Sequence, residues 1–270
     1  MAAALVVAGL ALGACASKDD DEDDLKLDDT PADVLYNQGL SAMNSGKMSE
    51  ASQKFEDIDR LHPYSEYARK ALLMSAYVNY TRGKNEEAIT AARRFVTLYP
   101  GSPDAPYAMY LIGQSYYRQI PVVERDQEVT AKALAAMDEL VQRYPDSDYA
   151  AEAKAKAMAT RDQLAGKEME IGRYYLQRDN YIAAINRFRV VVTVYQTTRH
   201  VEEALARLTE AYYRLGVIPE AQTAAAVLGH NFPDSPWYKD AYSLLQKGGY
   251  EPKQTESSWI AQSFKNFKLM

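Results

Sequence analysis

The sequence predicts an all-α protein, a TPR-like helical-repeat solenoid of five units with an extended fourth unit. The main reason is a recurring spacing, in which an alanine is followed twelve residues later by a residue where a helix is expected to end. The pairs are Ala51 with Pro63, Ala88 with Pro100, Ala133 with Pro145, Ala184 with Gln196, and Ala221 with Pro233. No stretch alternates apolar and polar residues for long enough to predict a strand. A spacing that recurs this regularly is typical of repeat proteins, in which each structural unit packs only on the units next to it.

The second helix of each expected unit carries a stripe of small and apolar residues. In chain order the stripes are Ala51, Phe55, Ile58; Ala88, Ala92, Phe95; Ala133, Met137, Leu140; Ala184, Phe188, Val191; and Ala221, Ala225, Leu228. Steps of four and three residues place each set on one face of a helix. We therefore expect these residues to form the core.

The helix ends and turns are marked by residues with a clear conformational effect. A proline that lacks an N–H and constrains its predecessor is expected to stop four of the five second helices. A Ser or Thr two residues later is expected to be the N-cap of the next helix: Ser65, Ser102, Ser147, Thr198 and Ser235. Turns inside units are expected at Gly46, Gly83, Asp179 and Gly216.

The distances between these end marks are 37, 45, 51 and 37 residues. The tetratricopeptide repeat has a period of about 34 residues, so the array is TPR-like with longer connections. The 45-residue unit contains an insert at residues 118–130. The 51-residue unit contains a long first helix, expected at residues 149–177, which we interpret as a strut between two halves of the array.

The net charge of −6 comes from one short segment. Residues 16–30 contain eight acidic residues and two lysines, and the remainder of the 270-residue chain is charge-balanced. A balanced body gives no support for nucleic-acid binding, which requires a basic surface. The acidic run is expected to be a solvated linker.

The first fourteen residues form an apolar run that ends at Cys15, the single cysteine of the chain. This run is too short to span a membrane and has the length of a signal-peptide core. Leu12-Gly13-Ala14-Cys15 resembles the lipobox of bacterial lipoproteins, which implies a signal peptide at 1–14, lipid attachment at Cys15 and a flexible linker at 15–32. Ala16 then points to the outer membrane by the same resemblance. The alternative is a signal peptide with an unrelated cysteine.

The sequence offers no arrangement of residues that predicts catalysis. His62, His200 and His230 lie near helix ends without partners at metal-ligand spacing, and Glu86-Glu87 and Glu202-Glu203 suit the first turns of helices. We therefore expect no enzyme activity, no metal site and no cofactor.

Tyrosine is over-represented, with 21 residues. Several fall on the expected first helices, which line one face of a TPR-like array, and tyrosine suits the binding of an extended peptide. Candidate groove residues are Tyr36, Asn37, Tyr77, Tyr80, Tyr110 and Gln114, with Asn79 nearby. The alternative for each tyrosine is packing between helices.

Residues 34–246 resemble the BamD family of outer-membrane lipoproteins, which belong to the β-barrel assembly machinery. The more specific stretches include residues 55–71, Arg125-Asp126, residues 162–175 and Tyr181 to Arg187 (YIAAINR). The resemblance implies N-terminal units at 33–147 that receive unfolded outer-membrane β-barrel proteins, and C-terminal units at 148–246 that bind a periplasmic domain of BamA. It also implies other accessory lipoproteins as partners, attachment to the periplasmic face of the outer membrane through the lipid, and a BamA-facing position for Arg187.

The tail at 247–270 extends past the last repeat and is expected to be either an added helix or a segment ordered by a partner. Two other functional classes share parts of this layout. One is a periplasmic TPR adaptor, and the other is a pilotin lipoprotein of a pilus-assembly system.

Overall fold

The computed structural model describes residues 30–265, and all regular structure within that range is helical. The predicted signal peptide, Cys15 and most of the predicted linker lie outside the described residues. The helices are α1 (Ala32–Asn44), α2 (Met48–Leu61), α3 (Glu66–Thr81), α4 (Asn85–Leu98), α5 (Ala105–Tyr117), α6 (Glu128–Arg143), α7 (Ala150–Leu176), α8 (Tyr181–Val194), α9 (Val201–Arg214), α10 (Ile218–Asn231), α11 (Pro236–Lys247) and α12 (Trp259–Phe264).

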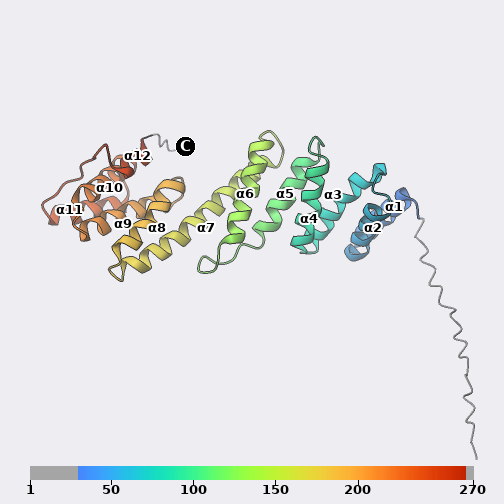
Figure 1. Cartoon of the computed structure of the whole chain (residues 1–270), viewed down its shortest axis with the longest axis horizontal. Helices are drawn as coiled ribbons and strands as arrows, with labels where there is room; N and C mark the ends of the chain where they lie inside the picture. Colours follow the sequence, from blue (N-terminus) through green and yellow to red (C-terminus); the bar gives the residue numbers. More distant parts are fainter. Residues whose placement is uncertain (1–29, 266–270) are drawn as a thin grey trace, which may run out of the picture.

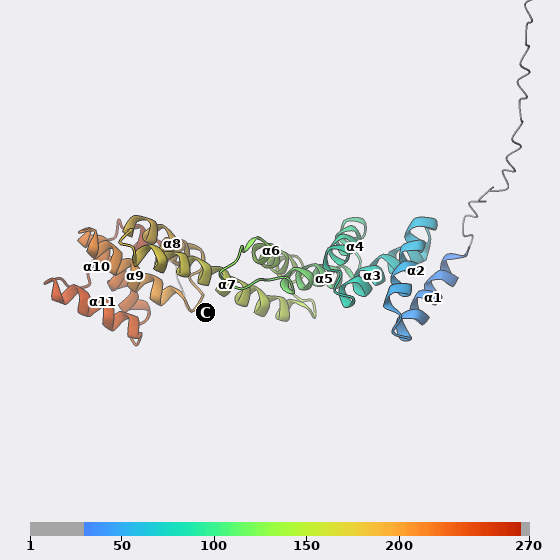
Figure 2. The same cartoon turned by 90° about the horizontal axis from the view of Figure 1, so that it is seen from below.

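These helices form an elongated array of helical hairpins, which Figures 1 and 2 show from two directions. From α1 to α10, each helix packs on the one that follows it in the chain. The first helices of successive units also touch, α1 with α3, α3 with α5 and α5 with α7. Their outer sides therefore make one continuous surface, which confirms the predicted solenoid.

The predicted stripes form the core of the array. Every stripe residue, from Ala51 in α2 to Leu228 in α10, has an exposed fraction of 0%. The second helices end where predicted, at the residue before His62, Tyr99, Tyr144, Tyr195 or Phe232. The four predicted turn residues all have positive φ: Gly46, Gly83, Asp179 and Gly216.

The predicted N-caps are only partly correct. Ser65 caps α3 and accepts a hydrogen bond from the Ala68 N–H at 3.2 Å, and Ser235 is the N-cap residue of α11 but makes no capping bond. The prediction is wrong at Ser102, Ser147 and Thr198, because α5, α7 and α9 begin two residues later than a cap at these positions requires. The Ser147 and Thr198 hydroxyls instead donate to the carbonyls of the preceding turns.

The 27-residue helix α7 links the two halves of the array, as the interpretation as a strut requires. Its first part, at Ala153 and Ala157, belongs to a core shared with α5 and α6. Its second part, at Ala165 and Met169, belongs to the large core of α8–α12. The insert after α5 lies along the same helix, because Gln163 Nε2 donates to the Pro121 carbonyl at 3.0 Å and Lys167 Nζ to the Glu124 carbonyl at 2.7 Å.

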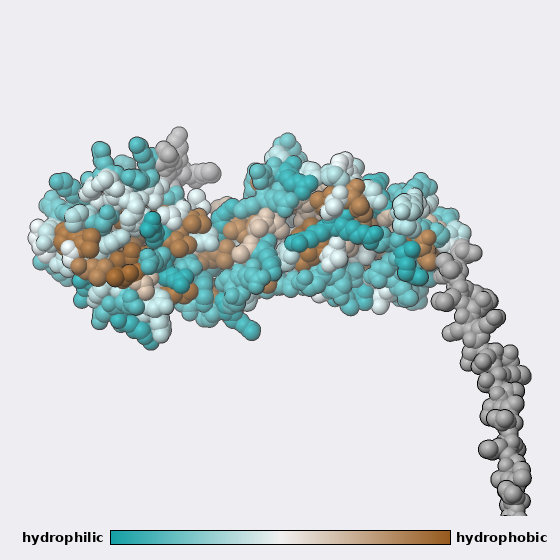
Figure 3. All heavy atoms as spheres, viewed as in Figure 1, coloured by the Kyte–Doolittle hydropathy of each residue, from teal (hydrophilic) through white to brown (hydrophobic). Residues whose placement is uncertain are grey.

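The tail adds the expected helix and returns to the body. After α11, which packs on α9, the chain crosses α10, where Gln222 Nε2 donates to the Glu251 carbonyl at 2.8 Å. Helix α12 then packs on α10 and α8, with Ile260 fully buried. Apolar side chains gather on the surface over α9–α11 and in smaller groups over the middle of the array, while polar side chains cover most of the rest of this face (Figure 3).

Candidate functional site

The structure gathers tyrosines from three neighbouring first helices on one surface. Tyr77 and Tyr80 come from α3, Tyr107 and Tyr110 from α5, and Tyr149 from the residue before α7. The ring centroid of Tyr149 lies 5.3 Å from that of Tyr107 and 5.0 Å from that of Tyr110. We call these five residues the tyrosine face. Each of them is partly exposed, so the face presents ring surface and hydroxyls together.

Charged side chains border the tyrosine face. The Arg118 guanidinium lies 3.9 Å from the ring centroid of Tyr80 and donates to the Tyr80 carbonyl at 2.7 Å. The Lys156 ammonium lies 5.9 Å from the Tyr110 ring centroid and 5.0 Å from that of Tyr117, and pairs with Glu152 at 2.9 Å. A cation near the face of an aromatic ring is attracted to it, so Arg118 and Lys156 favour the observed ring positions.

Three hydroxyls of this surface, those of Tyr107, Tyr110 and Tyr149, have a raised pKa and stay protonated at neutral pH. Burial, followed by the neighbouring Tyr77 and Tyr149, raises the pKa of Tyr107 to about 12. Burial and a hydrogen bond to Glu152 raise the pKa of Tyr110 well above its usual value. Hydrogen bonds from Lys156 and Tyr110 lower the pKa of the Glu152 carboxyl. The face therefore offers neutral hydroxyl donors beside a carboxylate and an ammonium group.

The predicted groove residues do not all lie together. Tyr77, Tyr80 and Tyr110 come together on the tyrosine face. Tyr36 lies one unit away, with its ring centroid 5.6 Å from that of Phe55 and 5.5 Å from that of Tyr67. Asn37 is exposed on α1.

The amides behave differently from the tyrosines. Gln114 is 4% exposed, and its side chain already donates to Glu152 at 3.1 Å and accepts from Lys156 at 2.6 Å. It supports the charged border and leaves little surface for direct contact. Asn79 faces α2, where it accepts from the Ser52 hydroxyl at 3.0 Å, so its predicted place beside a bound strand is wrong.

Sequence reasoning missed Tyr149, Glu152 and Lys156. An aromatic residue near the start of successive first helices, at Tyr67, Tyr107 and Tyr149, is a signal that could have indicated the first of them. The charged pair had no such signal, because its partner Gln114 lies 38 residues from Glu152 and 42 from Lys156.

Arg187, on α8, is far along the chain from the tyrosine face. Its Nη1 lies 3.3 Å from Glu168 Oε2 of α7, and its side chain is 43% exposed. The guanidinium is therefore held in place by an internal carboxylate while part of it faces solvent.

Within residues 30–265 no group of His, Cys, Asp and Glu side chains is placed to hold a metal ion. The three histidines lie in different parts of the array: His62 Nε2 donates to the Thr30 carbonyl at 2.8 Å, His200 lies beside Asp162, and His230 lies beside α12. Over the same residues, none of the helices combines the length and the apolar character needed to cross a bilayer.

The hairpin array defines a helical-repeat protein, and the tyrosine face is its candidate binding surface. Comparison with known proteins gives the family. The model of YfiO, described as an outer membrane lipoprotein, matches residues 28–228, so the chain belongs to that family.

Several relatives of this chain are named outer membrane protein assembly factor BamD. The outer membrane protein assembly factor BamD of Caulobacter vibrioides is 46% identical over 252 residues, which cover 93% of this chain and 82% of that protein. The protein of this name in Rickettsia prowazekii is 41% identical, covering 90% of this chain and 95% of its own length. The one in Neisseria meningitidis serogroup A is 37% identical, covering 87% and 92%.

Proposed function

We propose that this chain is a non-catalytic scaffold lipoprotein of the β-barrel assembly machinery, which helps to assemble and insert β-barrel proteins into the outer membrane. Membership of the YfiO family and the name shared by the relatives support this role over those of a TPR adaptor or a pilotin. The observation that carries the proposal is the tyrosine face, a partly exposed aromatic surface built from consecutive first helices.

The tyrosine face is the proposed site for unfolded β-barrel proteins. Its rings supply apolar contact without demanding one sequence, and its hydroxyls can bond the free N–H and C=O groups of an extended chain. The N-terminal units at 33–147 would hold most of this site together with Tyr36 and Asn37, and Tyr149 would join it from the start of the C-terminal units. A periplasmic domain of BamA would bind the C-terminal units at 148–246, beside Arg187, and other accessory lipoproteins would lie along the array.

The proposed location is the periplasmic face of the outer membrane, with the chain anchored by lipid on Cys15. The lipobox-like residues before Cys15 and the family description support this anchor. Palmitate labelling that persists after Cys15→Ser would contradict it.

The experiment that tests the client site measures binding of a fluorescent peptide copied from a transmembrane β-strand of an outer-membrane protein. We expect Tyr77→Ala combined with Tyr80→Ala to weaken binding by about tenfold or more, since aromatic anchors dominate such contacts. Tyr64→Ala is the matched control, because Tyr64 is 100% exposed in the loop before α3 and lies outside the face. Equal affinity of the double variant and the wild type, with helicity intact, would remove the site.

A further inference from the structure

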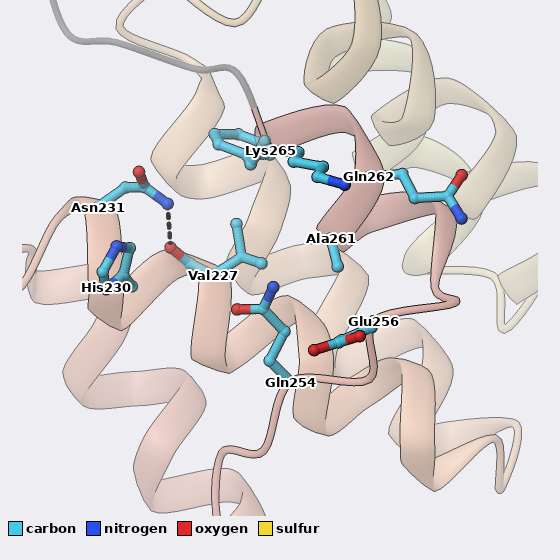
Figure 4. Close-up of a pocket in the computed structure, with 9 residues that line it drawn as sticks. Val227, His230, Asn231, Gln254, Glu256, Ala261, Gln262 and Lys265 are labelled. Atoms are coloured by element: carbon cyan, nitrogen blue, oxygen red, sulfur yellow. Dashed lines mark hydrogen bonds between the residues drawn. The ribbon is translucent and has the colours of Figure 1, made fainter.

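Helix α12 shows what the groove between two successive second helices can hold. It lies between α8 and α10, where the Trp259 Nε1–H donates to the Tyr212 hydroxyl at 3.0 Å and the Arg189 guanidinium lies 4.9 Å from the Trp259 ring centroid. Figure 4 shows Ala261, Gln262 and Lys265 of this segment around the same hollow as Val227 and Asn231 of α10. A six-residue amphipathic helix is therefore sufficient to occupy such a groove.

The groove between α4 and α6 is the corresponding surface of the N-terminal half, and no described segment lies in it. It encloses about 340 Å³ and has an apolar floor that includes Val96, Met109 and Ile112. This surface is on the second-helix side of the array, whereas the tyrosine face is built from first helices.

The two grooves repeat the same residues at the same register. Arg93 and Arg189 both stand five residues after the stripe alanine of their helix, and Val96 and Val192 both stand eight residues after it. Tyr116 and Tyr212 are both the twelfth residue of their first helix, α5 and α9. The arginine and the tyrosine that hold Trp259 in the filled groove thus have direct equivalents in the open one.

The open groove differs from the filled one in what lies between these two residues. Between α8 and α10, the indole of Trp259 contacts both Arg189 and Tyr212. Between α4 and α6, Arg93 Nη2 donates directly to the Tyr116 hydroxyl at 3.0 Å. The pair is satisfied internally by a single bond that an indole N–H and ring can replace.

The groove between α2 and α4 does not share this arrangement. Glu56 occupies the position of Arg93, and the groove carries Asp59, Glu86 and Glu87 as well. In α6 the same position is Asp138, which pairs with Arg161 of α7 at 2.6 Å, so an arginine at this position is present in the groove between α4 and α6 but not in that between α6 and α8.

The charges of the open groove indicate the chemistry of its occupant. Lys132 is the equivalent of Glu220, which in the filled groove accepts a hydrogen bond from the Ser258 hydroxyl at 2.6 Å. Arg143 is the equivalent of Asn231, which lies beside Lys265 in the filled groove. Lys132 and Arg143 pair with Glu128 and Glu139 one turn away, at 2.6 and 2.9 Å. Such exposed pairs contribute little and exchange readily for a partner's carboxylates.

We propose that the groove between α4 and α6 binds a short amphipathic helix of a partner protein, with an acidic N-cap, a tryptophan at the first helical position, apolar residues at the second and sixth, and an acidic residue at the end. The N-cap acid would pair with Lys132 and the terminal acid with Arg143. A second copy of this chain fits less well, because its Lys265 would approach Arg143. A partner bound there would leave the tyrosine face free.

The test uses a fluorescein-labelled peptide of residues 256–265 carrying Ser258→Asp and Lys265→Glu, titrated with the full chain. We expect saturable binding to the wild type. Ala135→Glu should weaken it by about tenfold or more, because Ala135 is exposed and lines the groove, and a glutamate there fills it and repels the acidic peptide. Ala131→Glu is the matched control, since Ala131 is exposed on the same helix outside the groove. Arg93→Ala should cost about tenfold by removing the cation under the indole, while Arg94→Ala should not.

Absence of saturable binding to the wild type would overturn the proposal, as would equal losses in the two alanine-to-glutamate variants. Equal affinity for the unaltered 256–265 peptide would remove the acidic requirement. Self-association of the chain that Ala135→Glu abolishes would identify a second copy as the occupant and refute the partner chemistry. Ala135→Glu should leave binding to the tyrosine face intact, so a failure here is distinguishable from a failure of the proposed client site.

Discussion

The ring of Phe188 in α8 lies directly against Gly172 of α7, where a Cβ atom built on the glycine would be 2.4 Å from the ring carbon Cε1. The same relationship recurs between Phe55 and Gly39, and between Met137 and Gly113. Each large residue belongs to a predicted stripe, and each glycine lies on the first helix of the same unit. The two helices of each unit can approach this closely because the glycine has no side chain to collide with the large residue.

Gly172→Ala should lower the free energy of unfolding by about 1–3 kcal/mol. The added methyl group must displace the buried Phe188 ring, and the free energy that this costs exceeds the gain from the higher helix propensity of alanine. Gly101→Ala is the control, since a Cβ there meets nothing within 4 Å. Urea denaturation followed by circular dichroism measures both. Equal stability of the two variants would show that the α7–α8 hairpin adjusts without strain.

The cap residues Ser65 and Ser235 should respond in opposite ways to loss of the hydroxyl. Ser65→Ala removes an N-cap bond and should cost about 1 kcal/mol. The Ser235 hydroxyl is buried without a hydrogen-bond partner among the described residues, so Ser235→Ala should be neutral or stabilising. Thermal unfolding distinguishes them, and a larger loss at Ser235 would contradict the difference.

Stability should fall in mild acid through His200. Burial lowers the pKa of His200, with the nearby Asp162 opposing that effect. Because the folded-state pKa lies below the unfolded value, the unfolded chain binds more protons. The contribution of this group is therefore complete above the unfolded pKa of about 6.5 and is lost as the pH falls toward the folded pKa.

His200→Asn should consequently show a shallower decline in unfolding free energy between pH 8 and pH 5 than the wild type does. The comparison of slopes, rather than of absolute stabilities, is decisive because asparagine also suits the N-cap of α9. Parallel curves would assign the acid sensitivity to other groups.

Arg187→Ala should affect binding far more than folding. The exposed pair with Glu168 contributes less than about 1 kcal/mol to stability, whereas loss of a cation opposite a BamA carboxylate should weaken binding by about tenfold or more. Calorimetry with a purified BamA periplasmic domain measures this. Arg60→Ala is the control, because Arg60 is also exposed and paired, with Asp57, but lies on α2. A double-mutant cycle without coupling to any BamA carboxylate would exclude the assignment.

Much of the fold could be predicted because its determinants are local. The stripe spacing, the prolines and the turn residues each act within a few positions, and the helices, turns and buried stripes follow them. The packing of Phe188 on Gly172 could not be read in this way, since it depends on how two helices cross. The return of α12 to α8 depends on contacts such as that of Trp259 with Tyr212, 47 residues apart.

The candidate site was predictable to a similar extent. The tyrosines of α3 and α5 could be placed on one side of the array because first helices align in register. The burial of Gln114 and the direction of Asn79 could not, because both depend on the partner helix that each amide meets.

Helix α7 also sets the angular phase between the two halves of the molecule. Each helical residue adds about 1.5 Å of length and about 100° of rotation. The 27 residues of α7 therefore separate the two halves by about 40 Å along the helix axis and fix the rotation of the second half relative to the first. Inserting a single residue would rotate the half that holds α8–α12 by roughly a quarter turn relative to the tyrosine face, while inserting seven would lengthen the offset by about 10 Å and nearly restore the relative orientation. Evolution of this spacer is therefore restricted to whole-turn steps if a polypeptide is to pass from one half to the other along the same side.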